Sequence, residues 1–560
     1  MDWQKNLLIA AILAVLLMLF IRFNEFREQQ PQTTPAVATA SVATNDPATG
    51  TTNNAGMAAS EIPTASTSAS ELNLEQKTSL AQQNLIKVKT DSLDIVINPL
   101  GGDIVSVALP RHYAELGSPD KAFVLLDNRD NHIYIAQSGL IGANGTDTAE
   151  GRPLFTTSQN EFVLKDGEQQ LVVDLNLQQG DTKITKRFTL NRADYLIGVE
   201  YLIDNQSTTP WTGQLYGQIK RDSQNFKKVS ALEMNPFLGA AINTTEENYK
   251  KVTFEDIAEK EYQTSKQGGW IAMVQHYFIS AWIPDANSEN HYRLRKLGTN
   301  DLYLMGFTSQ PLIVEPAKQG SIKASFYAGP KDTESLEKIS PYLDLTVDYG
   351  WLWWVAKPLF ALMKFIYSLV GNWGLAIIGL TLSVKAVFFH LSATSYKSMA
   401  RMRKLQPKMA ELKERCGDDR QKFSQEMMKL YKTEKVNPFG GCLPLLIQMP
   451  VFLALYYVLM ESVELRHAPF FGWIIDLSIK DPYYVLPIIY GATMWAMQKL
   501  NPQPTDPMQA KIMGMLPFIF TFMFLWFPAG LVLYWVTNNS LSILQQYIIT
   551  KQIEKADPKV

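Results

Sequence analysis

One lysine stands inside an apolar stretch in the C-terminal half of the sequence. Residues 371–391 are long enough to cross the roughly 30 Å hydrocarbon core of a membrane as a helix, yet they contain Lys385. An ammonium group costs roughly 2.5–3.5 kcal/mol at mid-bilayer, and such a cation would attract acidic groups. Thr381 lies one turn earlier on the same helical face and gives Lys385 a polar neighbour. Taken alone, Lys385 is equally compatible with a side chain that reaches the nearby membrane surface.

The later apolar stretches also carry polar side chains. Gln448 lies between two prolines, and Asn538 and Asn539 lie in the last stretch. Polar groups at membrane depth either bond across helices or face water, and both arrangements gather them on a shared face. We therefore expect Lys385, Thr381, Gln448, Asn538 and Asn539 to line a hydrated cavity that opens toward the cytoplasm.

The sequence contains no arrangement typical of a catalytic or metal site. No Asp or Glu lies deep in an apolar stretch, which speaks against the carboxylate proton relay of a transporter. P-loop, nucleophile-elbow and zinc motifs are absent, and the histidines of the central region are too far apart to be metal ligands. We expect no enzymatic activity, no metal and no cofactor. The formal net charge of −2 does not indicate a partner.

Six apolar stretches are predicted to be membrane-spanning helices. The first, in residues 1–27, is followed by charged residues rather than directly by a cleavage site, which favours a retained anchor over a signal peptide. The second is 371–391, and four more lie within 437–550. Residues 28–82 are rich in Gln, Thr, Ala and Ser with few large apolar side chains, and they are predicted to be a disordered linker.

The long region 83–345 has the alternating pattern of β-strands. Ile184, Phe188 and Leu190 occupy alternate positions of one run, and Pro, Gly, Asn and Asp clusters separate such runs. This pattern predicts an antiparallel β-sandwich. The region is large enough to bury its own core, and we expect a binding or scaffolding module rather than a catalytic one.

Residues 350–370 resemble a further span but have the features of an interfacial helix. Tryptophans crowd one end, and Lys357 and Lys364 are seven residues apart on one face, as in an amphipathic helix that lies in the membrane interface. If this helix spanned the membrane, the basic region that follows residue 391 would lie outside, against the positive-inside bias.

Residues 392–436 contain twelve Lys or Arg and six Asp or Glu, so we place them in the cytoplasm. Apolar residues at three- and four-residue steps predict an antiparallel helical hairpin with a bend at Pro407. Four methionines belong to this pattern: Met399, Met402, Met409 and Met427. They are expected to pack in the seam of the hairpin, with a protein-binding surface as the alternative. With this region inside, both chain ends, including the tail 551–560, are cytoplasmic and 83–345 lies outside.

Three motifs resemble those of the YidC membrane-protein insertase family. They are QEMMKLY at 425–431, VNPFGGCLPLLIQMP at 436–450 and LWFPAGLVLYW at 525–535. The likeness covers essentially the whole chain and points to the Gram-negative bacterial form with a large periplasmic domain. It implies a polytopic protein of the bacterial inner membrane in which five core spans form a hydrophilic groove open to cytoplasm and lipid. It also implies that the periplasmic domain is a β-supersandwich similar to sugar-mutarotase folds.

The same resemblance implies an insertase and chaperone that inserts and helps to fold nascent inner-membrane proteins, alone or with the Sec translocon. The ribosome, the signal-recognition receptor and membrane lipid are further partners to consider, and DNA is not. Lys385 stands where the family usually has a groove arginine. Thr381, Tyr534 and Trp535 lie on the helix faces that the resemblance assigns to client contact, and Trp535 stands where relatives often carry a tyrosine.

Two other functions are compatible with the composition. A solute transporter or channel would use the polar residues of the spans, but the sequence shows no internal symmetry of the kind that inverted repeats produce. A membrane-tethered carbohydrate-binding protein would use the large exported domain.

Overall fold

The computed structural model describes residues 81–556, apart from 83, 119, 130–131, 149–150, 225–235, 418, 435–442 and 502–506. The predicted anchor in 1–27 and almost all of the predicted linker 28–82 lie outside the described residues. The contacts between Cα atoms separate the chain into two compact units, and one of them contains Leu405–Val436. The other contains the β-strands and the apolar helices.

The described part of the β region, residues 84–330, contains nineteen strands. They are β1 (Ile86–Lys89), β2 (Asp94–Asn98), β3 (Asp103–Tyr113), β4 (Ala122–Arg129), β5 (His132–Ile141), β6 (Glu161–Val163), β7 (Gln170–Gln179), β8 (Thr182–Asn191), β9 (Leu196–Asn205), β10 (Trp211–Arg221), β11 (Gly239–Ile242), β12 (Lys250–Val252), β13 (Tyr262–Gln267), β14 (Ile271–Val274), β15 (Phe278–Pro284), β16 (Glu289–Lys296), β17 (Tyr303–Thr308), β18 (Leu312–Val314) and β19 (Lys318–Pro330). One short helix, α3 (Phe254–Glu259), lies among them.

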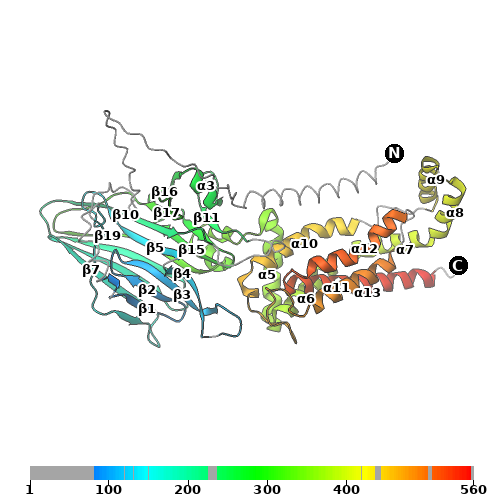
Figure 1. Cartoon of the computed structure of the whole chain (residues 1–560), viewed down its shortest axis with the longest axis horizontal. Coiled ribbons are helices and arrows are strands. Elements are labelled where there is room, and N and C mark those ends of the chain that lie inside the picture. Colours follow the sequence, from blue (N-terminus) through cyan, green and yellow to red (C-terminus); the bar gives the residue numbers. More distant parts are fainter. Residues whose placement is uncertain are drawn as a thin grey trace, which may run out of the picture. The chain divides into compact units, whose positions relative to one another are not determined.

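These strands form two sheets (Figure 1). The first has eleven strands in the order β13-β16-β17-β10-β5-β4-β3-β2-β1-β6, with β18 paired to β10. The second has eight strands in the order β12-β11-β14-β15-β19-β9-β8-β7. Within the described strands, β1 and β6 form a parallel pair, and the other named pairs are antiparallel.

The alternating sequence pattern sets which side chains enter the core. Along β8, Ile184, Lys186, Phe188 and Leu190 are buried, and the residues that alternate with them are less so, as a period of two requires. The three apolar side chains share one hydrophobic core with Ile97 of the other sheet and Val199 of β9, so the two sheets pack face to face. The predicted antiparallel β-sandwich is confirmed for the described strands.

The C-terminal part of the chain is helical, as predicted. Its helices are α5 (Trp353–Val370), α6 (Trp373–Val387), α7 (Phe389–Lys404), α10 (Leu443–Glu461), α11 (Val485–Leu500), α12 (Pro507–Phe524) and α13 (Ala529–Ala556). We call these seven helices the helical region; a short helix, α4 (Thr333–Ile339), precedes it. Helix α13 packs against α6, α7 and α11, and α5 packs against α6 and α10.

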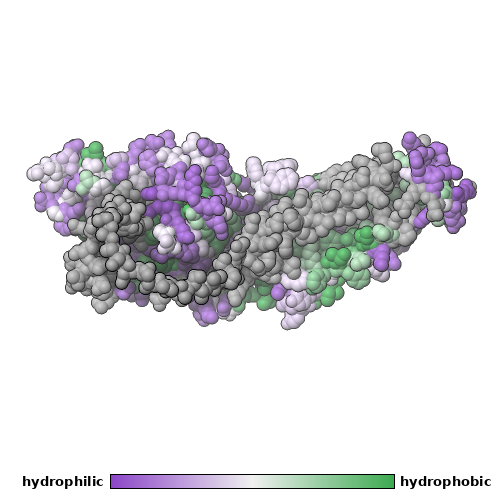
Figure 2. Space-filling view, turned by 45° about the horizontal axis from the view of Figure 1, so that its top comes forward, coloured by the Kyte–Doolittle hydropathy of each residue, from purple (hydrophilic) through white to green (hydrophobic). Residues whose placement is uncertain are grey.

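The outer surface of the helical region is apolar. Hydrophobic residues gather over it on the face seen in Figure 2, whereas the β region is mainly hydrophilic there. Ile488, Phe518, Phe522 and Leu544 are among the large apolar side chains that this region exposes. Apolar patches of this size are unusual on soluble monomers, and they match the expected contact with lipid.

The number of spans is not fixed by the lengths of these helices. Among the described residues, Gly350–Val370 is the segment long and apolar enough to cross a membrane by itself, and it is also the segment predicted to lie in the interface. Two other apolar helical stretches, Gln448–Glu461 and Ala510–Phe524, are shorter. The six predicted spans and the interfacial helix therefore stay predictions.

The predicted helix 371–391 is not continuous. It ends at Val387, and the next helix, α7, is bent from α6 by 69°. Helix α7 turns the small residues Ser392, Ser395 and Ala400 inward, where they are buried, and small residues allow neighbouring helices to approach closely. These small residues allow α7 to pack closely against α13 after the bend.

The hairpin that the structure shows is shorter than the predicted one, 392–436. It consists of α8 (Gln406–Cys416) and α9 (Arg420–Thr433), and Pro407 lies in the first turn of α8. The hydroxyl of Tyr431 is 3.6 Å from the sulfur of the buried Met409. Met427 is half-buried on α9. Met399 and Met402 lie on α7, in the other unit, and their part in the hairpin stays a prediction.

Candidate functional site

Polar side chains from four helices meet inside the helical region. We call them the polar cluster: Lys385 of α6, Gln448 of α10, Thr493 of α11, and Asn538, Asn539 and Ser542 of α13. Helix α13 is central because Asn538 and Ser542 are four residues apart on one face, while Asn539 is rotated toward α11. The cluster brings together four of the five residues predicted to line a cavity.

The ammonium of Lys385 donates a hydrogen bond to the hydroxyl of Ser542 over 2.8 Å. The Ser542 hydroxyl in turn donates to the backbone oxygen of Asn538 over 2.7 Å. Ser542 is buried, but Lys385 is only half-buried, and the next two residues, Ala386 and Val387, are exposed. The side chain of Lys385 therefore lies at the margin of the cluster and not in its interior.

Two further contacts join the helices of the cluster. The amide nitrogen of Gln448 donates to the side-chain oxygen of Asn538 over 2.5 Å. The amide nitrogen of Asn539 lies 3.4 Å from the hydroxyl oxygen of Thr493. Asn538 and Asn539 are both buried, so their polar atoms need such partners. These bonds tie α10 and α11 to α13.

Thr381 was predicted to be part of the same polar face. It is 1% exposed, and its hydroxyl donates to the backbone oxygen of Ile377 over 2.7 Å. A threonine bonded in this way satisfies its hydroxyl within its own helix. In this structure Thr381 therefore packs beside the cluster without a hydrogen bond to it among the described residues.

Tyr534 and Trp535 lie in an aromatic group next to the cluster. The rings of Trp535 and Phe452 are 4.5 Å apart, and those of Trp535 and Tyr490 are 6.1 Å apart. Tyr534 is buried, whereas Trp535 is half-buried. The indole N–H of Trp535 has no hydrogen-bond acceptor among the described residues. Because this nitrogen is itself buried, the assignment of Trp535 and Tyr534 to client contact stays a prediction.

The sequence did not reveal the contacts between the β region and the helical region. The ammonium of Lys331 is 2.7 Å from the carboxylate of Glu461 at the end of α10, and both side chains are largely buried. The imidazole of His276 is hydrogen-bonded to the backbone oxygen of Met460 over 2.8 Å. Lys331 and Glu461 are 130 residues apart, and no local pattern links them.

No group of three or more His, Cys, Asp or Glu side chains that could hold a metal ion occurs in the part of the chain that the structure describes. Cys442 lies outside that part, and Cys416 is a free thiol at the end of α8.

Comparisons with known families cover nearly all of the described chain. Residues 85–362 match the family described as YidC periplasmic domain, and residues 365–556 match the family described as 60Kd inner membrane protein. Both matches cover regions that the structure shows as β-rich and helical, respectively.

Several curated proteins are similar over their full length. A protein of Cellvibrio japonicus named membrane protein insertase YidC is 72% identical, covering 100% of both chains. Proteins of the same name from Saccharophagus degradans and Pseudomonas syringae pv. syringae are 52% and 50% identical, covering 99% and 100% of this chain and 100% of each relative.

Two solved structures align more weakly. An active YidC insertase with its first transmembrane domain resolved shares 19% identity, with a TM-score of 0.38, over 83% of this chain and 92% of that one. A galactose mutarotase related enzyme from Lactobacillus acidophilus shares 9% identity, with a TM-score of 0.30, over 44% of this chain and 97% of that one. Both TM-scores are low.

Proposed function

We propose, given that this chain belongs to the YidC family of membrane protein insertases, that it inserts nascent membrane proteins into the bacterial inner membrane and that the polar cluster receives the polar end of each client. The family is one of inner-membrane proteins. Proteins that carry the name insertase move a polypeptide between environments and are not enzymes. The route of the client through this chain is our proposal.

The observation that carries this proposal is the position of Lys385. Its ammonium has three N–H donors, and Ser542 accepts from one of them. Among the described residues, no carboxylate forms an ion pair with Lys385. A half-buried cation with spare donors attracts the acidic side chains of a passing segment more strongly than an exposed one does, because water screens it less.

The energy for insertion comes from the client itself. An apolar helix of about 20 residues gains free energy when it moves from water into lipid. The obstacle is the polar segment that must cross with it, because each uncompensated polar group costs several kcal/mol in hydrocarbon. In our proposal the cluster supplies temporary hydrogen bonds to that segment while the apolar helix leaves along the exposed apolar faces. No nucleotide is needed.

The proposed topology follows from charge and composition. The basic excess of residues 392–436 is expected in the cytoplasm, which puts both chain ends there and the β region in the periplasm. Helix α5 lies in the membrane interface in this arrangement, and five spans form a groove open to the cytoplasm and the lipid. The Sec translocon, the ribosome and the signal-recognition receptor are proposed partners.

The proposal is tested by reconstituted insertion of two clients that differ only in their translocated tails, one acidic and one neutral. Lys385→Ala is expected to slow insertion of the acidic-tailed client about tenfold, which corresponds to ~1.4 kcal/mol, and to leave the neutral-tailed client nearly unchanged. The matched control is Lys499→Ala, because Lys499 lies on α11 over the ring of Trp495 and outside the cluster. Equal losses for both clients would exclude electrostatic attraction by Lys385.

A further inference from the structure

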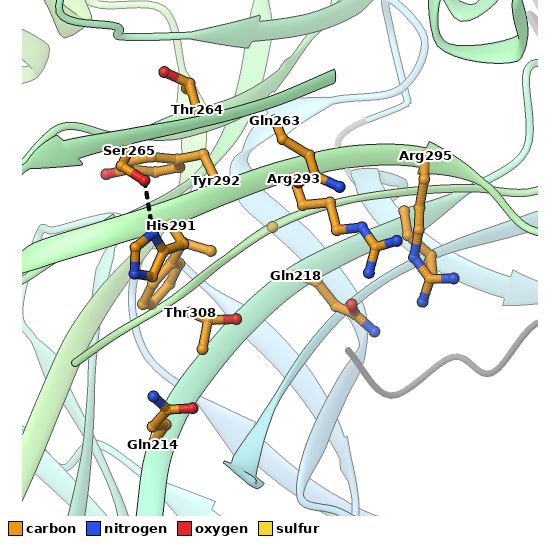
Figure 3. A pocket seen from close by; sticks show the side chains of 13 residues that line it. Gln214, Gln218, Gln263, Thr264, Ser265, His291, Tyr292, Arg293, Arg295 and Thr308 are labelled. Atoms are coloured by element: carbon orange, nitrogen blue, oxygen red, sulfur yellow. Dashed lines mark hydrogen bonds between the residues drawn. The ribbon is translucent and has the colours of Figure 1, made fainter. Parts of the chain in front are cut away.

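The β region contains a cavity of about 490 Å³ on one face of its eleven-stranded sheet (Figure 3). It is bounded by side chains of β10, β13, β16 and β17. Its polar lining is Gln214, Gln218, Gln263, Thr264, Ser265, His291, Arg293, Arg295 and Thr308. Cavities of 300–1,000 Å³ with convergent polar groups are the usual sites of small ligands.

The strand register explains why the sheet is hollow here. Gln263, Arg293, Gly306 and Gln218 are direct neighbours on four successive strands. Side chains on neighbouring strands at paired positions point to the same side of a sheet, so Gly306 leaves a gap between Arg293 and Gln218. A Cβ atom on Gly306 would come within 2.5 Å of the Cβ of Gln218. The glycine therefore forms the floor of the cavity.

The lining carries a net positive charge of one, because it contains two guanidinium groups and the neighbouring Glu261 offsets that of Arg293. It includes the guanidinium groups of Arg293 and Arg295, and no carboxylate belongs to it. Arg293 is held by Glu261 through its Nε and Nη2 atoms, the latter over 3.0 Å, which fixes the guanidinium and leaves Nη1 for another acceptor. In Figure 3 the two guanidinium groups lie on the same side, near the amides of Gln218 and Gln263. Planar guanidinium groups are well suited to bind a carboxylate.

The rest of the lining suits a ligand with several hydroxyl groups. An amide side chain both donates and accepts, and a hydroxyl does the same. Gln218 is oriented from the neighbouring strand, because its amide nitrogen donates to the side-chain oxygen of Gln137 on β5 over 3.0 Å. Ser265 and His291 are paired across β13 and β16, with 2.6 Å between Oγ and Nδ1. Such mixed donors and acceptors fixed on a sheet recognise polyols rather than apolar molecules.

We infer that this cavity is a binding site for a small acidic saccharide. The carboxylate of the ligand lies against Arg293 and Arg295, and its hydroxyl groups contact Gln218, Gln263 and Thr308. This site is independent of the polar cluster and of the insertion mechanism, so it would give the β region a ligand of its own in the compartment that this region faces.

The test is ligand binding by the full-length protein in nanodiscs, with saturation-transfer NMR and calorimetry. The probes are glucuronate, glucose, acetate and a tripeptide of glutamates. Glucuronate is expected to bind at millimolar concentration or below and at least about tenfold more tightly than glucose or acetate, because it alone offers both carboxylate and hydroxyl groups. Absence of glucuronate binding would overturn the inference. So would equal binding of acetate, which indicates a simple anion site, or tighter binding of the peptide.

Two variants locate the site. Arg295→Gln is expected to weaken glucuronate binding about tenfold or more, because a hydrogen bond between charged groups is lost, and Thr308→Val about threefold. Arg129→Gln is the matched control, since Arg129 is an exposed arginine at the end of β4 outside the cavity. Unchanged binding in both Arg295→Gln and Thr308→Val, with folding verified by circular dichroism, would place the ligand elsewhere and refute the assignment.

Discussion

The β region and the helical region each contain a lysine among buried groups, and the two ammonium groups have different hydrogen-bond partners. Lys186 of β8 is fully buried, and its ammonium donates to the backbone oxygens of Gly101, Gly102 and Ser138 over 3.0, 2.8 and 3.0 Å. All three N–H donors of this ammonium are thus used. Lys385 of α6 is half-buried and donates to Ser542 alone among the described residues.

The surroundings of Lys186 are themselves an enclosed network. Burial lowers the pKa of Lys186 to about 7, with Asp103 and Asp147 opposing this effect and Arg152 adding to it. Arg152 bonds both carboxylates. Every charged group is held by a neighbour, so Lys186 is a structural residue that crosslinks the two sheets.

A third lysine, Lys331, joins the two regions. It is as buried as Lys186, but its partner is the carboxylate of Glu461 in the helical region. The three lysines differ in their partners: Lys186 has three backbone carbonyls, Lys331 has a carboxylate, and Lys385 has a single hydroxyl. Lys186 and Lys331 have structural roles because their ammonium groups are bonded within the chain, whereas in our proposal Lys385 keeps N–H donors for a passing client.

The largest expected effect is that of Lys186→Met. The methionine has a similar length but removes three hydrogen bonds from a charged donor, each worth about 1.5–3 kcal/mol. Arg152 still donates to the backbone oxygens of Gly101 and Ser138, so the oxygen of Gly102 is the acceptor that loses its side-chain donor. We expect the β region to lose about 3 kcal/mol of stability or more, measured by urea-dependent pulse proteolysis of the full-length protein. Lys183→Met, at an exposed position of the same strand, should change little. An equal loss of stability in both variants would show that Lys186 has no special structural role.

Lys331→Met should cost about 2 kcal/mol, because it leaves the carboxylate of Glu461 largely buried without its partner. The double variant Lys331→Met with Glu461→Leu should recover most of this loss, since two apolar side chains can replace a buried ion pair. A double-mutant cycle on the same proteolysis assay gives the coupling energy. No coupling between the two positions would mean that the contact does not hold the regions together.

The pH dependence of stability should distinguish Lys186 from the other lysines. Its pKa is about 7 in the folded protein, whereas the usual value for a lysine is 10.5. Between pH 7 and pH 10.5 the unfolded chain therefore binds more protons than the folded protein. Stability should therefore rise with pH above about 7, by up to ~1.4 kcal/mol per pH unit. Measured as the difference between the wild type and Lys186→Met, this slope isolates the lysine. A difference that stays constant from pH 7 to 9 would contradict the assignment.

The smallest expected effect is that of Ser542→Ala. Removing the hydroxyl frees the ammonium of Lys385 from its resting partner, whose hydrogen bond is worth about 0.5–1.5 kcal/mol. If the ammonium is kept for clients, insertion of an acidic-tailed client should be about twofold to fivefold faster and that of a neutral-tailed client unchanged. Slower insertion of the acidic-tailed client would show that Ser542 positions Lys385 instead of competing with clients. Ser540→Ala, at an exposed position of α13, is the control.

Regular elements were predictable from single stretches of sequence. The period of two in residues 182–191 gives β8, and the apolar run before Lys385 gives α6. The predicted hairpin 392–436 is divided where α7 ends at Lys404, and the sequence does not mark this point because basic residues continue across it. Met399 and Met402 fit the periodicity of the hairpin, yet they lie on α7, and the boundary between the two units follows Lys404.

The residues of the candidate site could be predicted from the sequence, but the hydrogen bonds between them could not. Lys385, Gln448, Asn538 and Asn539 stand out because each is polar within an apolar run. The partner of Lys385 lies 157 residues away, and Ser542 is one of several hydroxyls on α13. Thr381 shows the limit of a helical-face argument, since its hydroxyl bonds within its own helix.

The β-rich and helical regions, the family and the polar residues within apolar runs can all be recognised in the amino-acid sequence, because periodicity and hydropathy are local properties. Which N–H donors are hydrogen-bonded depends on the packing of distant segments. Lys186 lies in an unremarkable alternating strand, and its three acceptors come from positions up to 85 residues away. A hydrogen bond depends on the distance between atoms in space, and that distance is fixed only when sheets and helices pack together.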